Sequence, residues 1–173
     1  MTITFPVATA SPAGLIKSTD WNNLRDSIGY LLNRPSQSII LDHGADYTNN
    51  VIGWADIDAT SLKITLANKG SLVYVYFSGV VLSAASSGVF FDFTLNGARV
   101  GAAGANGLAG VSASGATTTK TTLSFGSFVA VSPGSNVFKV QWNPQTAAVM
   151  TLFGGAGVSP TDYMIQFAAV EVA

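Results

Sequence analysis

The feature that most constrains the fold is the stretch 121–142, TTLSFGSFVAVSPGSNVFKVQW, in which apolar residues alternate in two runs. An alternation of period two is typical of β-strands with one buried face. The pattern shifts by one residue after Gly126, which predicts a β-bulge at that glycine. Between the runs, Pro133 and Gly134 favour a type II turn. The stretch therefore predicts a long antiparallel hairpin that serves packing and carries no chemistry.

Similar patterns continue from Ser38 to the end of the chain and predict roughly eight to ten strands. The strongest turn signal between them is Asn96-Gly97, because this dipeptide favours a two-residue hairpin loop. The segments 72–77 and 89–95 are apolar on both faces. In an antiparallel sandwich the inner faces form the core, so we expect the apolar outer faces to be covered by a neighbouring subunit.

The composition points in the same direction. Only 10% of the 173 residues are charged, whereas about 25% is usual in globular proteins. With a net charge of −1 the chain has no field that would attract nucleic acid or an anionic membrane, so we predict neither partner. No apolar run approaches the roughly 18 residues of a membrane span. Because the chain has no cysteine, disulfides and thiolate chemistry are excluded.

The N-terminal segment 1–16, MTITFPVATASPAGLI, mixes β-branched residues with proline and glycine and so favours an extended arm over a helix. Such an arm is either a disordered tail or a strand-like ligand for the surface of another protein. In the second interpretation the contacts are made by Ile3, Phe5, Pro6 and Val7.

The segment 17–37 is predicted to form one short helix, over about residues 20–33, followed by a linker. Ser18 or Thr19 can cap this helix, and Pro35 prevents its continuation. Its apolar residues are spaced 3, 4 and 3 apart, which is the spacing of a coiled-coil seam. The seam packs either on the helix's own domain or in a short parallel bundle at an oligomer axis. It consists of Trp21, Leu24, Ile28 and Leu31, with Leu32 widening it.

Candidate catalytic and metal-binding residues are few. His43 is the single histidine, and it lies between Asp42 and Asp46 without a recognisable nucleophile motif. Asp56 and Asp58 would share one face of a strand and could contribute to a calcium site, although calcium takes about 6 to 8 oxygen ligands. We therefore predict no enzyme activity, no metal and no cofactor.

Three aromatic residues raise a further alternative. Tyr47, Trp54 and Tyr163 could form an exposed patch on which sugars stack, or they could pack in the core or at an interface. The first arrangement is what a protein that binds a host-surface glycan would need.

Four stretches together resemble a known family. They are GSLVYVYFSG at 70–79, FDFTLNGARV at 91–100, VFKVQW at 137–142 and a last strand that ends almost at the C-terminus. This run is similar to the trimeric jelly rolls of the tumour-necrosis-factor/C1q type, especially the versions in bacteriophage fibre and decoration proteins. TDWNNLRDSI at 19–28 is also similar to the segment that follows the N-terminal arm in many phage structural proteins.

The resemblance implies a homotrimer in which the terminal strand lies near the threefold axis, so that Tyr163, Ile165 and Phe167 pack at or next to the trimer interface. It also implies that the N-terminal segment attaches the trimer to other virion proteins, of the capsid or the tail. Asp56 and Asp58 match no calcium motif of the family, so metal and receptor roles of animal relatives are not carried over.

The sequence thus predicts an all-β protein: an antiparallel jelly-roll sandwich at 38–173, preceded by the extended arm at 1–16 and the short helix at 17–37. The predicted function is that of a bacteriophage structural protein located in the virion, either a capsid decoration or a head or tail fibre. The alternative is a receptor- or glycan-binding fibre tip.

Overall fold

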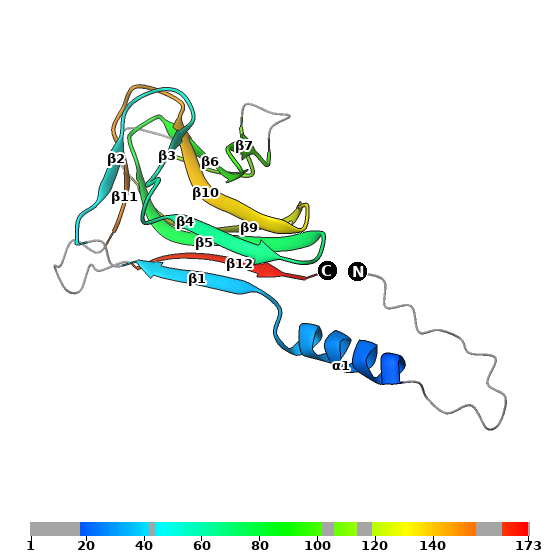
Figure 1. Cartoon of the computed structure of the whole chain (residues 1–173). Helices are drawn as coiled ribbons and strands as arrows, with labels where there is room; N and C mark the ends of the chain where they lie inside the picture. Colours follow the sequence, from blue (N-terminus) through cyan, green and yellow to red (C-terminus); the bar gives the residue numbers. More distant parts are fainter. Residues whose placement is uncertain (1–17, 42–43, 102–105, 114–118, 155–163, 173) are drawn as a thin grey trace.

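The computed structural model describes residues 18–41, 44–101, 106–113, 119–154 and 164–172. These residues form one helix and twelve strands, arranged as a β-sandwich with the helix outside it (Figure 1). The elements are α1 (Ser18–Leu32), β1 (Ser36–Leu41), β2 (Tyr47–Asn49), β3 (Ala55–Asp56), β4 (Lys63–Asn68), β5 (Leu72–Ser83), β6 (Gly88–Leu95), β7 (Ala98–Arg99), β8 (Ala109–Ser112), β9 (Thr119–Ala130), β10 (Gly134–Pro144), β11 (Met150–Leu152) and β12 (Ile165–Glu171).

The strands form two sheets, and every described pairing is antiparallel. In sheet A, β9 pairs with one edge of β5, and β12 and β11 pair with the other edge. β1 then joins β12, and β2 joins β11. In sheet B, β10 and β6 lie at the centre; β4 and β3 extend the sheet beyond β10, and β8 and β7 extend it beyond β6.

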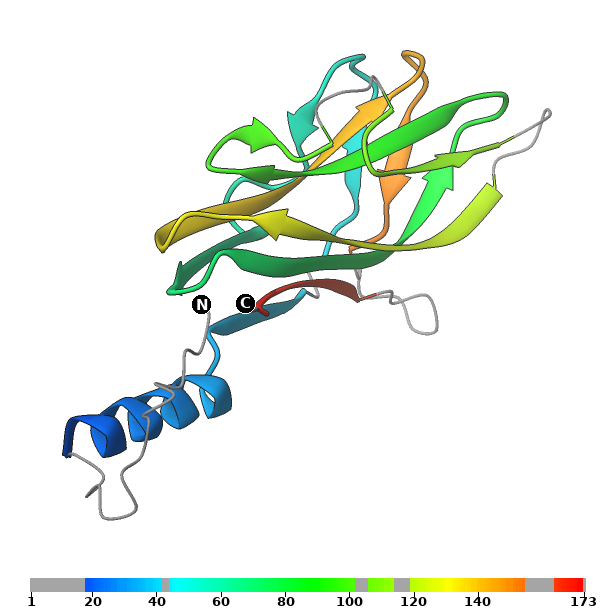
Figure 2. The same ribbon diagram turned by 90° about the vertical axis from the view of Figure 1, so that its right-hand side faces the viewer.

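The chain passes repeatedly from one sheet to the other. It runs from β4 in sheet B to β5 in sheet A and back to β6, and again from β8 through β9 to β10. Figure 2 shows the two layers from the side. This is the connectivity of an antiparallel jelly roll, in which paired strands are distant in sequence. The predicted fold class is therefore confirmed.

The predicted hairpin over 121–142 is wrong. Both runs are strands, but β9 belongs to sheet A and β10 to sheet B, so the turn between them links the two sheets. Side-chain amides hold this corner: Asn136 donates to the Ser132 carbonyl at 2.7 Å and to the side-chain oxygen of Asn68 at 2.6 Å. Gly134 has a φ of 130°, a backbone conformation that favours glycine.

The predicted β-bulge at Gly126 is also wrong, because β9 pairs with β5 in one unbroken register from Ala130 to Thr119. A glycine is needed at this position for a steric reason instead. A Cβ atom there would lie 2.3 Å from the hydroxyl oxygen of Tyr74, whose ring lies over it. Gly126 therefore provides space for an aromatic side chain of the neighbouring strand.

The Asn96-Gly97 hairpin is confirmed. It joins β6 to β7 with Leu95 opposite Ala98, and its two residues have φ angles of 51° and 88°. Positive φ at both positions is what this kind of two-residue loop requires.

Phenylalanine rings and aliphatic side chains fill the space between the sheets. Phe93 lies at the centre, with its ring 4.6 Å from that of Phe125 and 6.1 Å from that of Phe167. Burying each such ring contributes on the order of 1.5–3 kcal/mol to the free energy of unfolding. Further buried rings are those of Phe77, Phe91, Phe138 and Trp142.

The predicted helix is confirmed as α1, which begins two residues earlier than expected. It lies outside the sandwich and leads directly into β1 (Figures 1 and 2). At its end, the backbone N–H and the side-chain amide of Asn33 both donate to the Gly29 carbonyl at 3.0 Å. None of the helical segments that the structure describes has the length and apolar character of a membrane span.

Candidate assembly surfaces

The outer face of sheet A carries aromatic and aliphatic side chains interspersed with serine, threonine and glutamine. Along β5, every second residue is buried in the core, and the residues between them point away from the core and are only partly covered. These outward residues include two tyrosines and three aliphatic side chains. They are Leu72, Tyr74, Tyr76, Val80 and Leu82.

Neighbouring strands extend this face. On β9, Phe128 stands opposite Tyr74, with ring centroids 5.0 Å apart, and it is 64% exposed. On the other side, β12 presents Ala168 and Val170, and β1 presents Ile40, which is 66% exposed. We call the outward residues of β1, β5, β9 and β12 face A.

Face A carries almost no charge. Among the described outward positions of its four strands, Lys120 is the one ionisable group apart from the tyrosines, and its ammonium lies 4.4 Å from the centre of the Phe153 ring. Apolar patches that are uncharged and exposed on a single chain are typical of surfaces that bind another protein.

The predicted seam of α1 is the second apolar surface. Its four side chains are between 37% and 58% exposed, so the alternative in which they pack on their own domain is wrong for the described structure. Leu32, at the end of the helix, is more exposed still. A helix of 15 residues is marginal on its own in water, so this seam needs a partner. The exposed residues are Trp21, Leu24, Ile28 and Leu31.

The residues predicted for the trimer interface lie elsewhere. Ile165 and Phe167 point inward from β12 and are fully buried in the core of one chain. Tyr163 lies outside the described residues. Contact of these residues with another subunit stays a prediction, while the outward positions on the same strand are Gln166, Ala168 and Val170. The alternation in the sequence located the strand but not which of its faces turns outward.

The predicted anchoring residues also lie outside the part of the chain that the structure describes. They are Ile3, Phe5, Pro6 and Val7. His43, the residue weighed for catalysis, is likewise not among the described residues.

The two aspartates weighed for calcium have separate roles. Asp56 accepts hydrogen bonds from the Lys139 ammonium at 2.6 Å and from the Gln141 amide at 2.7 Å. Asp58 accepts from the backbone N–H groups of Thr60 and Ser61 and from the Tyr47 hydroxyl. No group of three or more His, Cys, Asp or Glu suited to a metal occurs among the described residues.

The environment of Asp58 changes two pKa values. Burial of the Asp58 carboxyl opposes its ionisation, but the hydrogen bonds from the N–H groups of Ser61 and Thr60 and from Tyr47 outweigh it and lower its pKa to about 2. Burial, and then the hydrogen bond to Asp58, raise the pKa of Tyr47 above its usual range. The pair also joins the two sheets, because Tyr47 belongs to sheet A and Asp58 follows β3 of sheet B.

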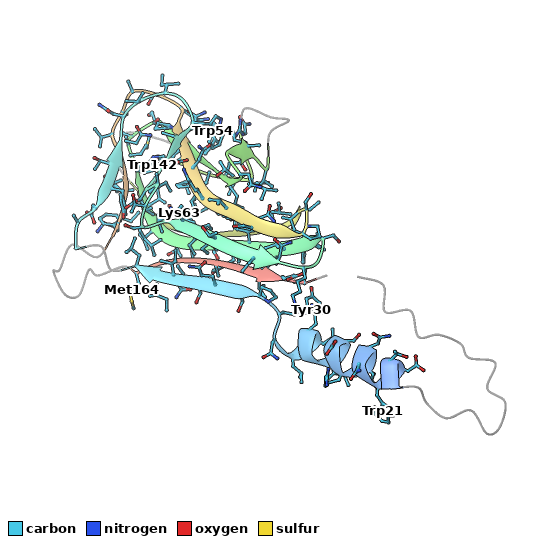
Figure 3. All side chains as sticks on the ribbon, in the orientation of Figure 1. Trp21, Tyr30, Trp54, Lys63, Trp142 and Met164 are labelled. Carbon is cyan, nitrogen blue, oxygen red and sulfur yellow. The ribbon has the colours of Figure 1, made fainter. Side chains whose placement is uncertain are left out.

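Two of the three aromatic residues weighed for sugar binding are already engaged, and the third, Tyr163, lies outside the described residues. The Tyr47 hydroxyl is bound to Asp58, and the guanidinium carbon of Arg99 lies 3.8 Å from the ring centre of Trp54. Trp54 lies among the loops at the end of the sandwich away from α1 (Figure 3). A sugar would therefore have to use the other face of the Trp54 ring.

No protein-family model and no curated protein sequence matches the chain.

Proposed function

We propose that this protein is a homotrimeric structural component of a virus particle, displayed as a bacteriophage capsid decoration or fibre and attached through its N-terminal segment. The observation that carries the proposal is face A, an almost uncharged surface whose aromatic and aliphatic side chains the described chain leaves partly uncovered. Its location in a virion and the number of three subunits rest on the sequence resemblance to phage jelly rolls. No reaction is assigned to the protein.

The chemistry of face A suits self-association. Burial of apolar surface is worth roughly 25 cal/mol per Å², and aromatic side chains supply much area per residue. Because face A is nearly free of charge, its burial costs little in desolvation of ions. Tyr76 and Ser124 already satisfy each other through a hydrogen bond of 2.7 Å between their hydroxyl groups. Burial of face A against another copy would therefore leave this pair of hydroxyl groups hydrogen-bonded.

The first test is the mass of the protein in solution. Light scattering at micromolar concentration should give three times the chain mass of 17.8 kDa. Phe128→Asp should weaken association at least 100-fold, or about 2.7 kcal/mol, because a carboxylate would be buried without a partner. Ser135→Asp, which introduces the same charge at an exposed position of sheet B, should leave the trimer intact. A monomeric wild-type protein would refute the trimer.

The second test concerns attachment. Deleting residues 1–16 should abolish co-sedimentation with undecorated particles while the trimer stays folded. Three arms on one trimer raise each other's effective concentration, so weak single contacts give tight overall binding. Retained co-sedimentation would move the anchor to α1 or to the jelly roll.

The alternative, a glycan-binding fibre tip, makes a different prediction. A glycan array should then show binding that is lost in Trp54→Ala and kept in Tyr76→Phe. Absence of binding on the array supports a purely structural role.

A further inference from the structure

A buried carboxylate connects α1 to the last strand of the jelly roll. Glu171, at the end of β12, is fully buried. Its side chain accepts hydrogen bonds from the backbone N–H groups of Lys69 and Gly70, in the turn between β4 and β5. A buried carboxylate needs such donors, because its transfer from water is otherwise costly.

The remaining donor comes from the helix. The hydroxyl of Tyr30 donates to Oε1 of the same carboxylate. Burial first, and then the hydrogen bond and the negative charge of Glu171, raise the pKa of Tyr30 to about 12, so its hydroxyl stays protonated at neutral pH. Tyr30 and Glu171 are 141 residues apart in sequence, so the contact ties the helix to the far end of the chain.

Two neighbouring contacts hold the same junction. The Arg34 side chain donates to the Val172 carbonyl, and the Glu171 backbone N–H donates to the Pro35 carbonyl at 2.9 Å. The chain between α1 and β1 is thus bound to the end of β12 on both sides of the carboxylate. These two contacts hold the start of β1, and the contact of Tyr30 extends the junction to α1 itself.

Tyr30 lies on the side of α1 opposite the seam. At 100° per residue, it is roughly 140° around the helix from the centre of the seam. Figure 3 agrees: Tyr30 points from the helix toward the sandwich, and Trp21 points to the other side. Tyr30 is partly buried, whereas Leu24 and Ile28 are exposed.

We propose that Tyr30 and Glu171 form an orienting lock, which fixes the rotation of α1 so that its apolar seam faces away from its own jelly roll and toward the equivalent seams of the other copies. The partner is thus a second and third copy of this chain, and this part rests on the proposed trimer. Fixing the helix in advance lowers the entropy lost on association, and so strengthens assembly without adding a contact between subunits.

The lock can be tested within one chain. Because the chain has no cysteine, two introduced cysteines, Asn22→Cys on α1 and Lys63→Cys on β4, carry the spin labels alone. Electron–electron double resonance on labelled protein diluted with unlabelled protein then reports the distance between α1 and the jelly roll of one chain. The lock is opened by Tyr30→Phe, which removes one hydroxyl and keeps the ring. The matched control is Tyr47→Phe, which removes a hydroxyl that donates to a carboxylate within the jelly roll and lies outside face A.

The expected result is a narrow distance distribution in the parent and in Tyr47→Phe, and a distribution at least twice as wide in Tyr30→Phe. Circular dichroism should show that all three proteins are folded. An unchanged narrow distribution in Tyr30→Phe overturns the lock, and so does a broad distribution in the parent.

A second measurement separates the lock from the proposed trimer. Leu24→Cys, in the middle of the seam, should form disulfides between copies, and adding Tyr30→Phe should lower their yield several-fold. Suppose that no disulfide forms between copies but Tyr30→Phe still widens the distance distribution within a chain. The lock is then supported, and the proposal that the seam of α1 meets the seams of other copies is refuted. If disulfides form equally with and without the Tyr30 hydroxyl, the trimer stands and the role of the lock in assembly is refuted.

Discussion

The outer faces of the two sheets differ in chemistry. Sheet B carries two ion pairs, one between Asp92 and Arg99 at 2.9 Å and one between Asp56 and Lys139 at 2.6 Å. Face A of sheet A instead carries aromatic and aliphatic side chains, of which Phe128 is the most exposed aromatic. Both sheets contribute similar phenylalanine-rich inner faces to one core.

The difference shows where each surface finds its partners. Both ion pairs on sheet B lie within one chain, and Asp92 also accepts from the backbone N–H groups of Phe93 at 2.8 Å and Gly101 at 2.9 Å. The side chains of face A stay partly exposed among the described residues, as is typical of surfaces that bind another protein. Substitutions on sheet B should therefore change the free energy of unfolding, whereas substitutions on face A should change assembly.

The largest effect is expected for a substitution in the core between the sheets, rather than on either outer face. Phe167→Asp places a carboxylate in the fully buried centre of the sandwich. The cost is several kcal/mol, comparable to the 5–15 kcal/mol that roughly spans the stability of a domain. We expect loss of the folded state, seen as loss of the near-ultraviolet circular dichroism signal.

The next residue on the same strand is the control. Ala168 points outward, so Ala168→Asp should leave a folded chain and reduce only its association. If Phe167→Asp gave a folded monomer, β12 would face outward in solution and the distinction between its two faces would be lost.

An intermediate effect is expected from the buried ion pair of sheet B. Asp92→Asn removes a charge that pairs with Arg99 and turns an acceptor into a donor that faces other donors. We expect a loss of about 2–4 kcal/mol in the free energy of unfolding, measured by denaturant titration. The more exposed pair is the matched control, and Asp56→Asn should cost about 1 kcal/mol or less. Equal losses of unfolding free energy in the two variants would show that burial does not determine how much each ion pair contributes to stability.

Local signals in the sequence predicted local structure well. Asn96-Gly97 requires positive φ angles, which the residues themselves favour, so the turn followed from the dipeptide. The spacing of Trp21, Leu24 and Ile28 likewise predicted the helix and which residues form its seam, but it left open whether the seam packs on its own domain. Alternation located the strands for the same reason, since it reports which residues share a face.

Strand partners and face assignments could not be predicted in this way. A tight turn between two alternating runs is compatible with a hairpin and with a corner between sheets, and the choice depends on β5 and β6, which are far away in sequence. Gly126 looked like a bulge because the Tyr74 ring that occupies its space comes from another strand. The lock between Tyr30 and Glu171 gave no signal, since neither residue belongs to a recognisable motif.

The smallest effect is the pH dependence of the free energy of unfolding. It distinguishes stability from assembly, because face A has no carboxylate among its described outward residues. The pKa of Asp58 is lowered from 3.8 to about 2, so its ionised form stabilises the fold above pH 4, and this contribution is lost as pH falls from about 4 to 2. After allowance for solvent screening it amounts to about 1 kcal/mol. Asp58→Asn should thus make the free energy of unfolding less dependent on pH between 4 and 2.

The mass of the folded assembly at pH 4 should match its mass at pH 7, because face A has no carboxylate to titrate among its described outward residues. Dissociation at a pH above the acid unfolding transition would show that a carboxylate takes part in assembly.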